Sequence, residues 1–510
     1  MANPLFDQLF GRHAGRTTPF LHLGDGITIT HSDFLAIAAR YANAFSQLGL
    51  TPGDRLALQV EKSPQALAAY AAAVQAGIVF LPLNTGYTPA ELEYFIENSG
   101  ARLVVCDPER AERLRPIASA SGARLETLDA QGEGSLPEIA RGQPATFDTV
   151  ARSADDLAAL LYTSGTTGRS KGAMLTQTNL LSNAETLVDY WRFTDADVLL
   201  HALPIFHTHG LFVATNVILL SGGSMIFLPK FDLDAMIAHL PQATSMMGVP
   251  TFYTRLLGDP RFTKELVRHM RLFVSGSAPL LAETHVQFEQ RTGHRILERY
   301  GMTETNMNTS NPYDGARRAG TVGFPLPGVE LKVTDPATGD RLPDGEIGQI
   351  EVRGPNVFKG YWQMPEKTRE ELREDGFFIT GDLGFIDDQG YLQIVGRNKD
   401  LIISGGYNIY PKEIESVLDD QPGVLESAVV GVPHPDFGET VVGFLVAENG
   451  RSPDVQAIEL AVGAELARFK HPRRLIMLPE LPRNTMGKVQ KNVLRQEYGG
   501  LFAEASDRKT

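Results

Sequence analysis

Apolar runs of strand length alternate with stretches of helical periodicity in the first hundred residues of the chain. The predicted elements are strands at 56–60, 78–83 and around Val104, and helices at 64–74 and 89–98. Ser63 can cap the first of these helices, and Pro64 suits its first turn. A strand–helix rhythm of this kind favours helices layered on largely parallel sheets, so we expect an α/β fold.

The pattern changes toward the C-terminus. Residues 348–352 and 391–395 alternate apolar and polar positions, which predicts half-exposed antiparallel strands. A charged joint at 396–400 (GRNKD) follows. The elements predicted beyond it are a helix at 411–418 and strands at 428–432 and 441–446. We therefore expect two domains, 1–397 and 398–510, that touch and rotate about the joint.

Composition excludes several classes of protein. With 43% hydrophobic and 21% charged residues, the 510-residue chain is typical of a globular protein and not of a disordered one. The formal net charge of −14 argues against a general nucleic-acid binder. It does not argue against small anionic ligands, because local charges bind those.

The chain has one cysteine, Cys106, so an intramolecular disulfide and a cysteine-based zinc site are both excluded. Cys106 ends an apolar run, which predicts a buried strand position. The first residues lack the pattern of a signal peptide, and no apolar run reaches the ~18–20 residues that span a bilayer. We therefore expect a cytoplasmic protein.

One segment, residues 163–172 (TSGTTGRSKG), is crowded with glycines and hydroxyl side chains. It follows an apolar strand predicted at 157–161. Glycines let backbone amides approach an anion, the hydroxyls add donors, and Lys171 supplies a positive charge. The segment predicts a phosphate-binding loop, although its spacing is not that of a Walker A loop. The alternative is a Gly-rich turn without a ligand.

Four segments in order resemble motifs of the adenylate-forming superfamily of acyl-CoA synthetases, adenylation domains and luciferases. They are the loop at 163–172, YGMTET at 300–305, GFFITGD at 376–382 with the joint at 396–400, and PRNTMGK at 482–488. The resemblance implies a large N-terminal domain of layered mixed sheets with helices and a β-barrel-like subdomain. It also implies a small, mobile α+β C-terminal domain.

The resemblance implies a reaction in two steps. A carboxylate attacks the α-phosphorus of ATP and releases pyrophosphate, and the thiol of coenzyme A then displaces AMP from the acyl-adenylate. Negative charge accumulates between two anions in the first step, so catalysis rests on positioning and on cations. ATP, Mg²⁺ and coenzyme A are the implied cofactors and co-substrates.

Motif residues acquire roles through the same resemblance. Glu304 is the expected magnesium ligand with Thr163, and Thr303 lies nearby. Asp382 is expected to accept the ribose hydroxyls, supported by Arg397. The residues implied to bind ATP or AMP are Thr163, Ser164, Gly165, Thr166, Thr167, Gly168, Lys171, Ser277, Ala278, Pro279, Glu298, Tyr300, Gly301, Met302, Thr303, Asp382, Arg397 and Lys488. The residues implied in catalysis are Lys488, His207, Thr303 and Glu304.

Lys488 follows a glycine in a turn that we expect to be exposed. By resemblance its ammonium reaches the attacking carboxylate and the α-phosphate. Because it lies beyond the joint, the C-terminal domain must swing about Lys399 to deliver it. The same swing would then bring Gly405, Gly406 and Tyr407 to the site for the coenzyme A step. Acylation of Lys488 would remove its charge, so we expect a modification site there.

Two arginines indicate which acid is used. Arg255 follows a strand-like segment at 248–250, and Arg299 precedes Tyr300. Buried unpaired charges are destabilising, so two guanidinium groups aimed into an acyl pocket predict a substrate with a second carboxylate. The alternatives are a solvated helix residue for Arg255 and a structural ion pair for Arg299.

Segments 204–210 (PIFHTHG) and 298–310 (ERYGMTETNMNTS) are similar to those of the malonyl-CoA synthetases, a branch of the superfamily. The resemblance implies that Arg255 and Arg299 hold the distal carboxylate. The implied acyl pocket is lined by His207, Thr208, Ser277 and Met307. It is small enough for a three-carbon diacid, with or without a methyl branch. For His207 a buried core role and a place in the pocket wall or gate are both open.

The expected function is an AMP-forming malonate:CoA ligase that makes malonyl-CoA through malonyl-adenylate, with methylmalonyl-CoA as a further product of the same pocket. Its expected partners are malonate, ATP and coenzyme A, with neither nucleic acid nor a membrane. One alternative is a ligase for another short acid, such as methylmalonate or acetoacetate. Another is a stand-alone enzyme that loads a carrier protein; about 20 residues follow Lys488, which argues against an attached carrier. A nucleotide-binding scaffold is the last, and the full set of catalytic positions argues against it.

Overall fold

The computed structural model describes residues 2–24, 26–163, 170–404, 407–434, 437–466, 468–484 and 487–502. The chain forms two compact units, one of residues 1–331 with 352–378 and the other of residues 332–351 with 379–510. This division differs from the boundary predicted after Arg397, because residues 332–351 share a sheet with residues that follow 378. The predicted boundary concerns rotation about the joint, and it stays a prediction.

The first unit contains a six-stranded sheet with the strand order β6-β5-β3-β4-β7-β8. Its strands are β3 (Arg55–Gln59), β4 (Val79–Pro82), β5 (Leu103–Cys106), β6 (Arg124–Thr127), β7 (Leu157–Thr163) and β8 (Lys171–Thr176). Strands β3 to β7 pair in parallel, and β8 returns antiparallel to β7. The predicted parallel sheet is confirmed, and Cys106 is buried at the end of β5 as expected.

A nine-stranded sheet forms the rest of the framework of this unit, in the order β15-β14-β13-β12-β11-β9-β10-β1-β2. Its strands are β1 (Pro19–His22), β2 (Thr28–Thr30), β9 (Val198–His201), β10 (Ser224–Phe227), β11 (Ser245–Gly248), β12 (Leu272–Ser275), β13 (Leu297–Met302), β14 (Asn306–Ser310) and β15 (Phe324–Pro325). The central strands are parallel, and the strands at both edges are antiparallel.

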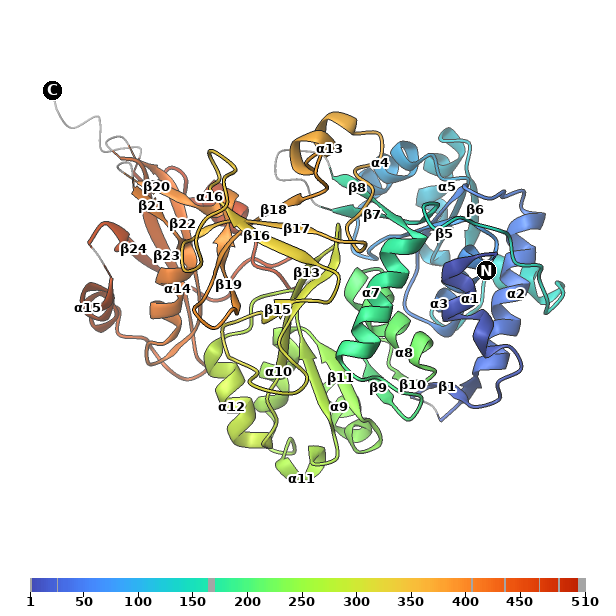
Figure 1. Ribbon diagram of the computed structural model, residues 1–510, viewed down its shortest axis with the longest axis horizontal. Coiled ribbons are helices and arrows are strands. Elements are labelled where there is room, and N and C mark those ends of the chain that lie inside the picture. Colours follow the sequence, from blue (N-terminus) through green and yellow to red (C-terminus); the bar gives the residue numbers. More distant parts are fainter. Residues whose placement is uncertain are drawn as a thin grey trace. The chain divides into compact units, whose positions relative to one another are not determined.

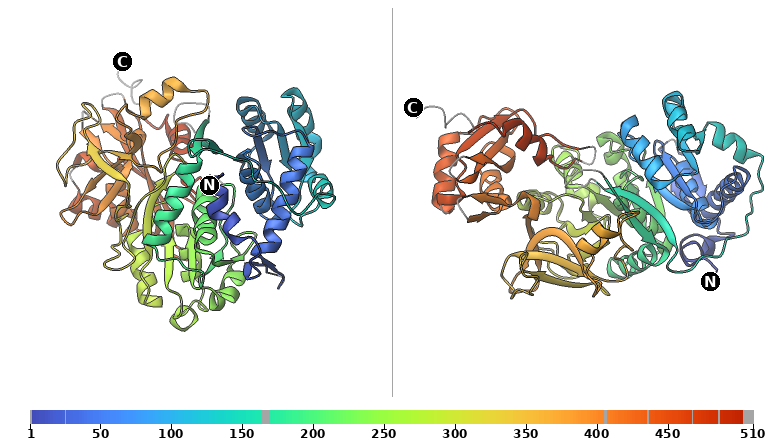
Figure 2. Two further views of the ribbon diagram at one scale, coloured as in Figure 1. Left: turned by 45° about the vertical axis from the view of Figure 1, so that its right-hand side comes forward. Right: turned by 90° about the horizontal axis from the view of Figure 1, so that it is seen from above.

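Helices cover the two sheets of the first unit (Figure 1). They are α1 (Pro4–Leu9), α2 (His31–Gln47), α3 (Pro64–Gln75), α4 (Pro89–Ser99), α5 (Ala111–Ala120), α6 (Ser135–Arg141), α7 (Gln177–Tyr190), α8 (Asn216–Ser221), α9 (Leu233–His239), α10 (Pro250–Leu257), α11 (Lys264–Val267), α12 (Ala282–Thr292) and α13 (Pro365–Glu371). Helix α7 contacts β7 and β8 of one sheet and β14 of the other, and α2 packs along α3 among the blue helices of Figure 2. Ser63 caps α3 and Pro64 starts it, as predicted.

The second unit contains a four-stranded and a five-stranded sheet. The four strands are β16 (Glu330–Thr334), β17 (Gly348–Arg353), β18 (Phe378–Ile386) and β19 (Leu392–Arg397); the β-barrel-like subdomain was expected in this region. The five strands are β20 (Ile402–Ser404), β21 (Tyr407–Ile409), β22 (Val424–His434), β23 (Gly438–Ala447) and β24 (Arg474–Leu478). The helices of this unit are α14 (Pro411–Asp419), α15 (Val455–Glu465) and α16 (Lys491–Tyr498).

The prediction of a half-exposed strand at 348–352 is wrong, because these residues of β17 are all buried. Its polar side chains are hydrogen-bonded inside the unit. Gln349 donates to the carbonyl oxygen of Asp382 at 3.0 Å, and Glu351 accepts from Thr334 at 2.8 Å. The alternation of apolar and polar residues therefore predicted the strand correctly but not its exposure. Polar side chains that are buried and hydrogen-bonded give the same sequence pattern as polar side chains that face solvent. Among the described residues, no helix is long and apolar enough to cross a membrane.

Candidate active site

The carboxyl ends of β11 and β12 lie side by side in the nine-stranded sheet, next to the first residues of β13. Register pairs Gly248 with Ser275, and Ser275 with Glu298. Ser277 lies just beyond the end of β12, and Arg299 lies inside β13, one residue after Glu298. Ligands of open α/β sheets bind outside the carboxyl ends of parallel strands, so this edge is the natural place for a substrate.

Arg299 is the unusual side chain at this edge. It is 3% exposed, and its Nε and Nη2 atoms have no hydrogen-bond partner. The backbone of Gly276 lies directly against the guanidinium group, where an added methyl group would collide with it. Burial lowers the pKa of Arg299 to about 9, although Tyr253 and Glu298 oppose that shift. A buried cation whose donors are unused is costly to the free protein and suited to an anion.

His209 lies close to this cation and was not among the predicted site residues. It begins a π-helical turn, His209–Thr215, a rare geometry that often marks functional sites. Its ring is 2% exposed, with Nδ1 3.2 Å from the hydroxyl oxygen of Ser277 and Nε2 without a partner. Burial, followed by the charge of Arg299, lowers its pKa far below the ordinary value, so the ring is neutral. Ser277 has a left-handed backbone (φ +72°), a strained state typical of functional sites.

Short contacts link the segments that carry the predicted acyl-pocket residues, although these residues are spread over 100 positions of the sequence. Thr208 donates a hydrogen bond to the side-chain oxygen of Asn306 at 2.7 Å, and Nδ1 of His207 accepts one from the backbone of His209 at 3.3 Å. Met307 is 1% exposed, and its backbone is bound at both polar atoms by Asn183. His207 is half-buried, and this exposure is compatible with a position in the wall or at the gate of the pocket.

Arg255 and Arg299 differ in their exposure. Arg255 is exposed on α10, and its guanidinium lies 5.6 Å from the centre of the Phe231 ring. The prediction of a strand-like segment at 248–250 is wrong beyond its first residue, because β11 ends at Gly248 and α10 begins at Pro250. A proline fixes the first helical turn and cannot donate to a strand, which explains the break. The role of Arg255 stays a prediction.

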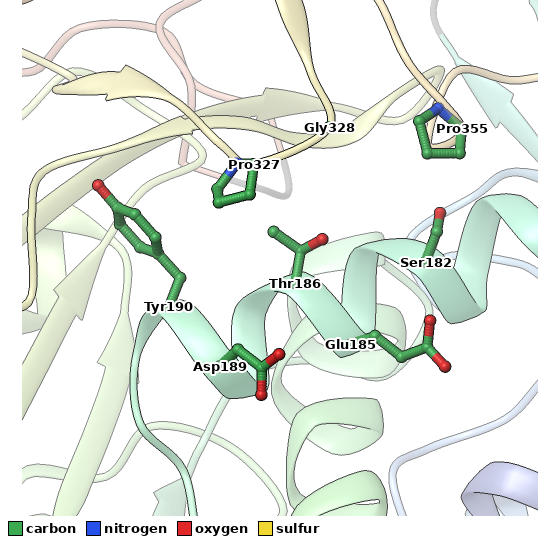
Figure 3. A pocket seen from close by; sticks show the side chains of 8 residues that line it. All are labelled: Ser182, Glu185, Thr186, Asp189, Tyr190, Pro327, Gly328 and Pro355. Carbon is green, nitrogen blue, oxygen red and sulfur yellow. The ribbon is translucent and has the colours of Figure 1, made fainter.

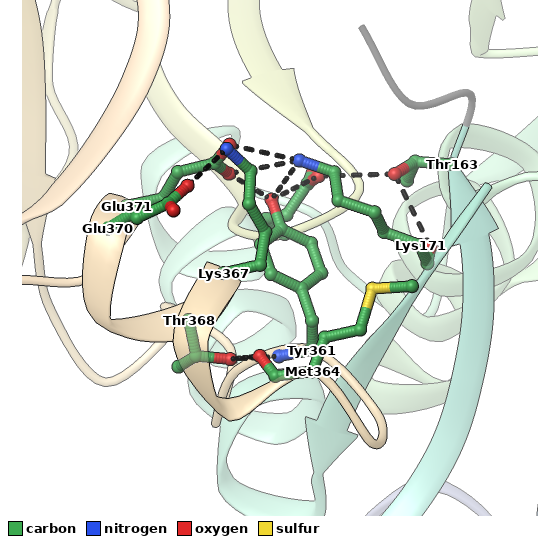
Figure 4. Close-up of polar contacts among 9 residues, drawn as sticks. Thr163, Lys171, Tyr361, Met364, Lys367, Thr368, Glu370 and Glu371 are labelled. Carbon is green, nitrogen blue, oxygen red and sulfur yellow. Dashed lines mark hydrogen bonds and ion pairs between the residues drawn. The ribbon is translucent and has the colours of Figure 1, made fainter. Parts of the chain in front are cut away.

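The predicted phosphate and magnesium residues form a connected cluster in the first unit (Figure 4). The hydroxyl of Thr163 donates to Oε1 of Glu304 at 3.4 Å, and the phenol of Tyr361 lies 3.1 Å from the same oxygen. The ammonium of Lys171 forms an ion pair, at 3.0 Å from Oε1 of Glu371. Tyr361 and Glu371 were missed by the sequence analysis, because they follow the loop by some 190 and 200 residues.

These residues fit a magnesium ion that is held mostly by substrate. Glu304 is buried, and no group of three or more acidic, histidine or cysteine side chains suited to a metal occurs in the described part of the chain. A single carboxylate beside a hydroxyl leaves the other positions to water and phosphate oxygens, as magnesium prefers. Gly301 and Met302, which end β13, and Thr303, which follows, are half-buried.

Several predicted residues lie outside the described residues. They are Ser164, Gly165, Thr166, Thr167 and Gly168 of the loop, and Gly405 and Gly406 of the coenzyme A segment. The described ends of the loop are Thr163 and Lys171, which pair across β7 and β8. Of the implied adenine pocket, Tyr300 is buried, whereas Ala278 is half-buried and Pro279 exposed. Glu298 accepts from the backbone of Leu280 at 3.3 Å.

The second unit holds the predicted ribose, hinge and lysine residues. Asp382 and Arg397 face each other across β18 and β19, with an ion pair of 2.8 Å. Burial lowers the pKa of Lys399, and the neighbouring Asp400 accepts from Arg495 at 2.6 Å. Lys488 is exposed, as expected, and its backbone is bound by the side chain of Asn484 at 2.9 Å.

A cavity of about 480 Å³ lies beside α7 in the first unit (Figure 3). It is lined by Ser182, Glu185, Thr186, Asp189, Tyr190, Pro327, Gly328 and Pro355. None of the predicted site residues lines it. Its charged side chains are acidic, so it does not suit the anionic ligands expected here.

Comparison with known proteins agrees with this geometry. A family model described as AMP-binding enzyme matches residues 8–362, and a second, described as AMP-binding enzyme C-terminal domain, matches residues 413–488. The chain belongs to the AMP-binding enzyme family. The resemblance to adenylate-forming enzymes is thereby confirmed, together with the layered α/β fold and its smaller C-terminal part.

Relatives of this AMP-binding enzyme include acid–CoA ligases. A malonate–CoA ligase from Arabidopsis thaliana is 37% identical over 485 residues, covering 89% of this chain and 79% of the relative. A sulfoacetate–CoA ligase from Cupriavidus necator is 36% identical and covers 93% of each chain. The ATP-bound structure of MatB from Rhodopseudomonas palustris superposes with a TM-score of 0.96 at 58% identity, covering 98% of this chain and 100% of MatB.

Proposed function

We propose that this protein is an AMP-forming acid–thiol ligase that couples malonate to coenzyme A. The observation that carries the proposal is the buried guanidinium of Arg299, whose Nε and Nη2 donors are unused. A distal carboxylate would accept both donors and pair the charge, whereas a monocarboxylic acid would leave the cation buried and unpaired. The proposed substrate is therefore a small diacid.

The relatives support this choice. Malonate is the acid of the Arabidopsis thaliana relative, and sulfoacetate, the acid of the Cupriavidus necator relative, also carries a second anionic group. Relatives named for feruloyl and long-chain fatty acids, at 35% and 32% identity, act on acids without one. The close packing of Gly276 against Arg299 favours a short diacid such as malonate, and methylmalonate is proposed as a second substrate.

In the proposed adenylation step, the described residues have separate roles. The substrate carboxylate attacks the α-phosphorus of ATP, and the bond to pyrophosphate breaks. Glu304 and Thr163 would hold magnesium, which neutralises phosphate charge when bound. Arg299 orients the diacid, so that its other carboxylate is presented for attack. Lys171 offers a positive charge to the phosphates, and Asp382 offers acceptors to the ribose.

Lys488 is the proposed cation for the attacking carboxylate and the α-phosphate. Residues 398–510 would rotate about Lys399 to deliver it, and to bring 405–407 to the thiol step, in which coenzyme A displaces AMP. Acylation of Lys488 would switch adenylation off. Its exposure makes it accessible to a modifying enzyme. We also propose a cytoplasmic location, where malonate, ATP and coenzyme A are available together.

A panel of acids tests the substrate. Pyrophosphate release is measured with ATP, Mg²⁺, coenzyme A and one acid at a time: malonate, methylmalonate, sulfoacetate, acetoacetate, acetate, a fatty acid and ferulate. We expect malonate to give the highest kcat/KM and the monocarboxylates almost none. Strong turnover of acetate, a fatty acid or ferulate without turnover of malonate would overturn the proposal.

Lys488→Ala separates an enzyme from a nucleotide-binding scaffold. In a ligase the variant should lose pyrophosphate release by a factor of about 10³ or more, while ATP binding changes little. Lys491→Ala is the matched control, because Lys491 lies three residues away and pairs with Glu415 at 2.6 Å. Equal activity of wild type and Lys488→Ala would show that the lysine takes no part in the reaction.

A further inference from the structure

Lys171, the cation expected to bind the phosphates of ATP, already has a carboxylate beside it. Both oxygens of Glu371 lie close to the Lys171 ammonium, at 3.0 and 3.1 Å. The ammonium also lies 4.3 Å from the centre of the Tyr361 ring and 3.2 Å from its hydroxyl. The Lys171 and Glu371 side chains are 12% and 21% exposed, so water screens this pair less than a surface pair.

Tyr361 separates this carboxylate from the proposed magnesium ligand. Its hydroxyl lies 2.6 Å from Glu371 and 3.1 Å from Glu304, and Figure 4 shows the Tyr361 side chain near Lys171 and Glu371. A phenol has one proton, and the shorter contact takes it. Glu371, at the shorter distance, therefore receives both the phenol and the lysine.

Glu371 remains ionised in this cluster. Burial alone raises the pKa of its carboxyl group, but hydrogen bonds from Tyr361, Lys367 and Lys171 outweigh burial and leave the pKa below its ordinary value. Lys367 lies 3.0 Å from Glu371 on α13, so the carboxylate keeps a second cation if Lys171 is withdrawn. The pair between Lys171 and Glu371 can thus open without leaving either side chain unpaired once phosphates are present.

We propose that Glu371 is a positioning residue that competes with the phosphates of ATP for Lys171, and so sets the affinity for nucleotide. The inference rests on the proposed function, in which Lys171 binds phosphate. ATP must draw the ammonium away from a carboxylate that repels the phosphates. Neutralising Glu371 removes this competitor, while the Tyr361 ring and the start of β8 still hold Lys171 in place. Pyrophosphate bound to the same cation would be released faster for the same reason.

Equilibrium binding of ATP to Glu371→Gln tests the competition. Calorimetry with Mg²⁺ and ATP, without acid or coenzyme A, should give a Kd about three- to tenfold lower than that of wild type, because one competing charge is lost. The difference should shrink as salt is added. Glu370→Gln is the matched control: it makes the same charge change one residue away, where Glu370 pairs with Lys367 at 2.8 Å, and its Kd should change less than twofold.

A double-mutant cycle with Lys171→Met makes the test specific. In the Lys171→Met background, Glu371→Gln should leave the Kd for ATP unchanged, since nothing remains to compete for. A Glu371→Gln protein that unfolds at the wild-type temperature but binds ATP no tighter would overturn the proposal. So would an equal gain in the Lys171→Met background. If the double-mutant cycle gives the expected Kd values but malonate is not turned over, only the assignment of malonate as substrate is wrong. If the wild-type protein does not bind ATP, the proposed function itself is wrong.

Discussion

Lys171 and Arg299 are two cations of the same unit, and both are expected to bind anions of the substrates. Lys171 is part-buried and already faces Glu371. Arg299 is fully buried, and two of its donor atoms have no partner. An internal carboxylate lowers affinity but leaves the site stable when empty, whereas an unpaired buried guanidinium costs stability and gains selectivity for a second anion. The predictions below test this contrast.

Arg299→Leu should give the largest effect. It should lower kcat/KM for malonate by about 10³-fold or more, because the distal carboxylate loses its only described buried cation with free donors. The temperature of unfolding of the free protein should not fall, since replacing an unpaired buried charge by an apolar side chain is neutral or stabilising. Activity against acids and thermal unfolding are measured together.

Arg295→Leu is the control for this variant, because Arg295 is half-exposed and pairs with Glu289 at 2.7 Å. It should leave malonate turnover near wild type. The contrast between Lys171 and Arg299 would be wrong if Arg299→Leu unfolded at a much lower temperature than wild type and kept its kcat/KM for malonate. Arg299 would then be a structural cation.

Gly276→Ala should lower kcat/KM for malonate by about 30-fold, a smaller effect. The added methyl group would collide with the Arg299 guanidinium and displace it without removing its charge. Gly258→Ala adds the same methyl group after α10, where the nearest atoms lie 3.5 Å away, and should be silent. An ATP Kd that shifts as much as the malonate KM would contradict a local effect on Arg299.

The pH dependence of malonate binding should show the smallest effect. Burial lowers the pKa of Arg299 to about 9, so the guanidinium proposed to bind the diacid is expected to lose its proton above that pH. The KM for malonate should therefore rise as pH increases through 9, by up to about tenfold between pH 8 and pH 10. The ATP Kd, measured without acid over the same range, provides the comparison. A malonate KM that stays flat to pH 10 would mean that Arg299 keeps its proton.

Much of the fold was predictable from local pattern. The strand at 56–60, the helix at 64–74 with its Ser63 cap, and the buried Cys106 are confirmed, because each follows from residues within a few positions of one another. The motifs also brought Thr163, Lys171 and Glu304 to one cluster, as the resemblance implied. Their proposed roles in substrate binding remain predictions.

Pattern failed where the answer lay in distant contacts. Arg255 and Arg299 both look like cations of an acyl pocket, and local pattern does not show that one is exposed on α10 while the other is buried inside β13. His209 was overlooked beside His207, because the sequence does not show that the ring two positions along, at the start of the π-helical turn, is the fully buried one. Burial and register depend on what packs against a segment, and local periodicity does not carry that information.

The sequence by itself determined the elements, the family and the residues that can carry charge to the substrates. Only the tertiary structure decided which charges have partners. It placed Glu371 beside Lys171 across 200 positions, and it left two donor nitrogens of the enclosed Arg299 without a partner. The physical reason is that ion pairing depends on distance and desolvation in the folded chain, and neither is encoded by neighbours in sequence.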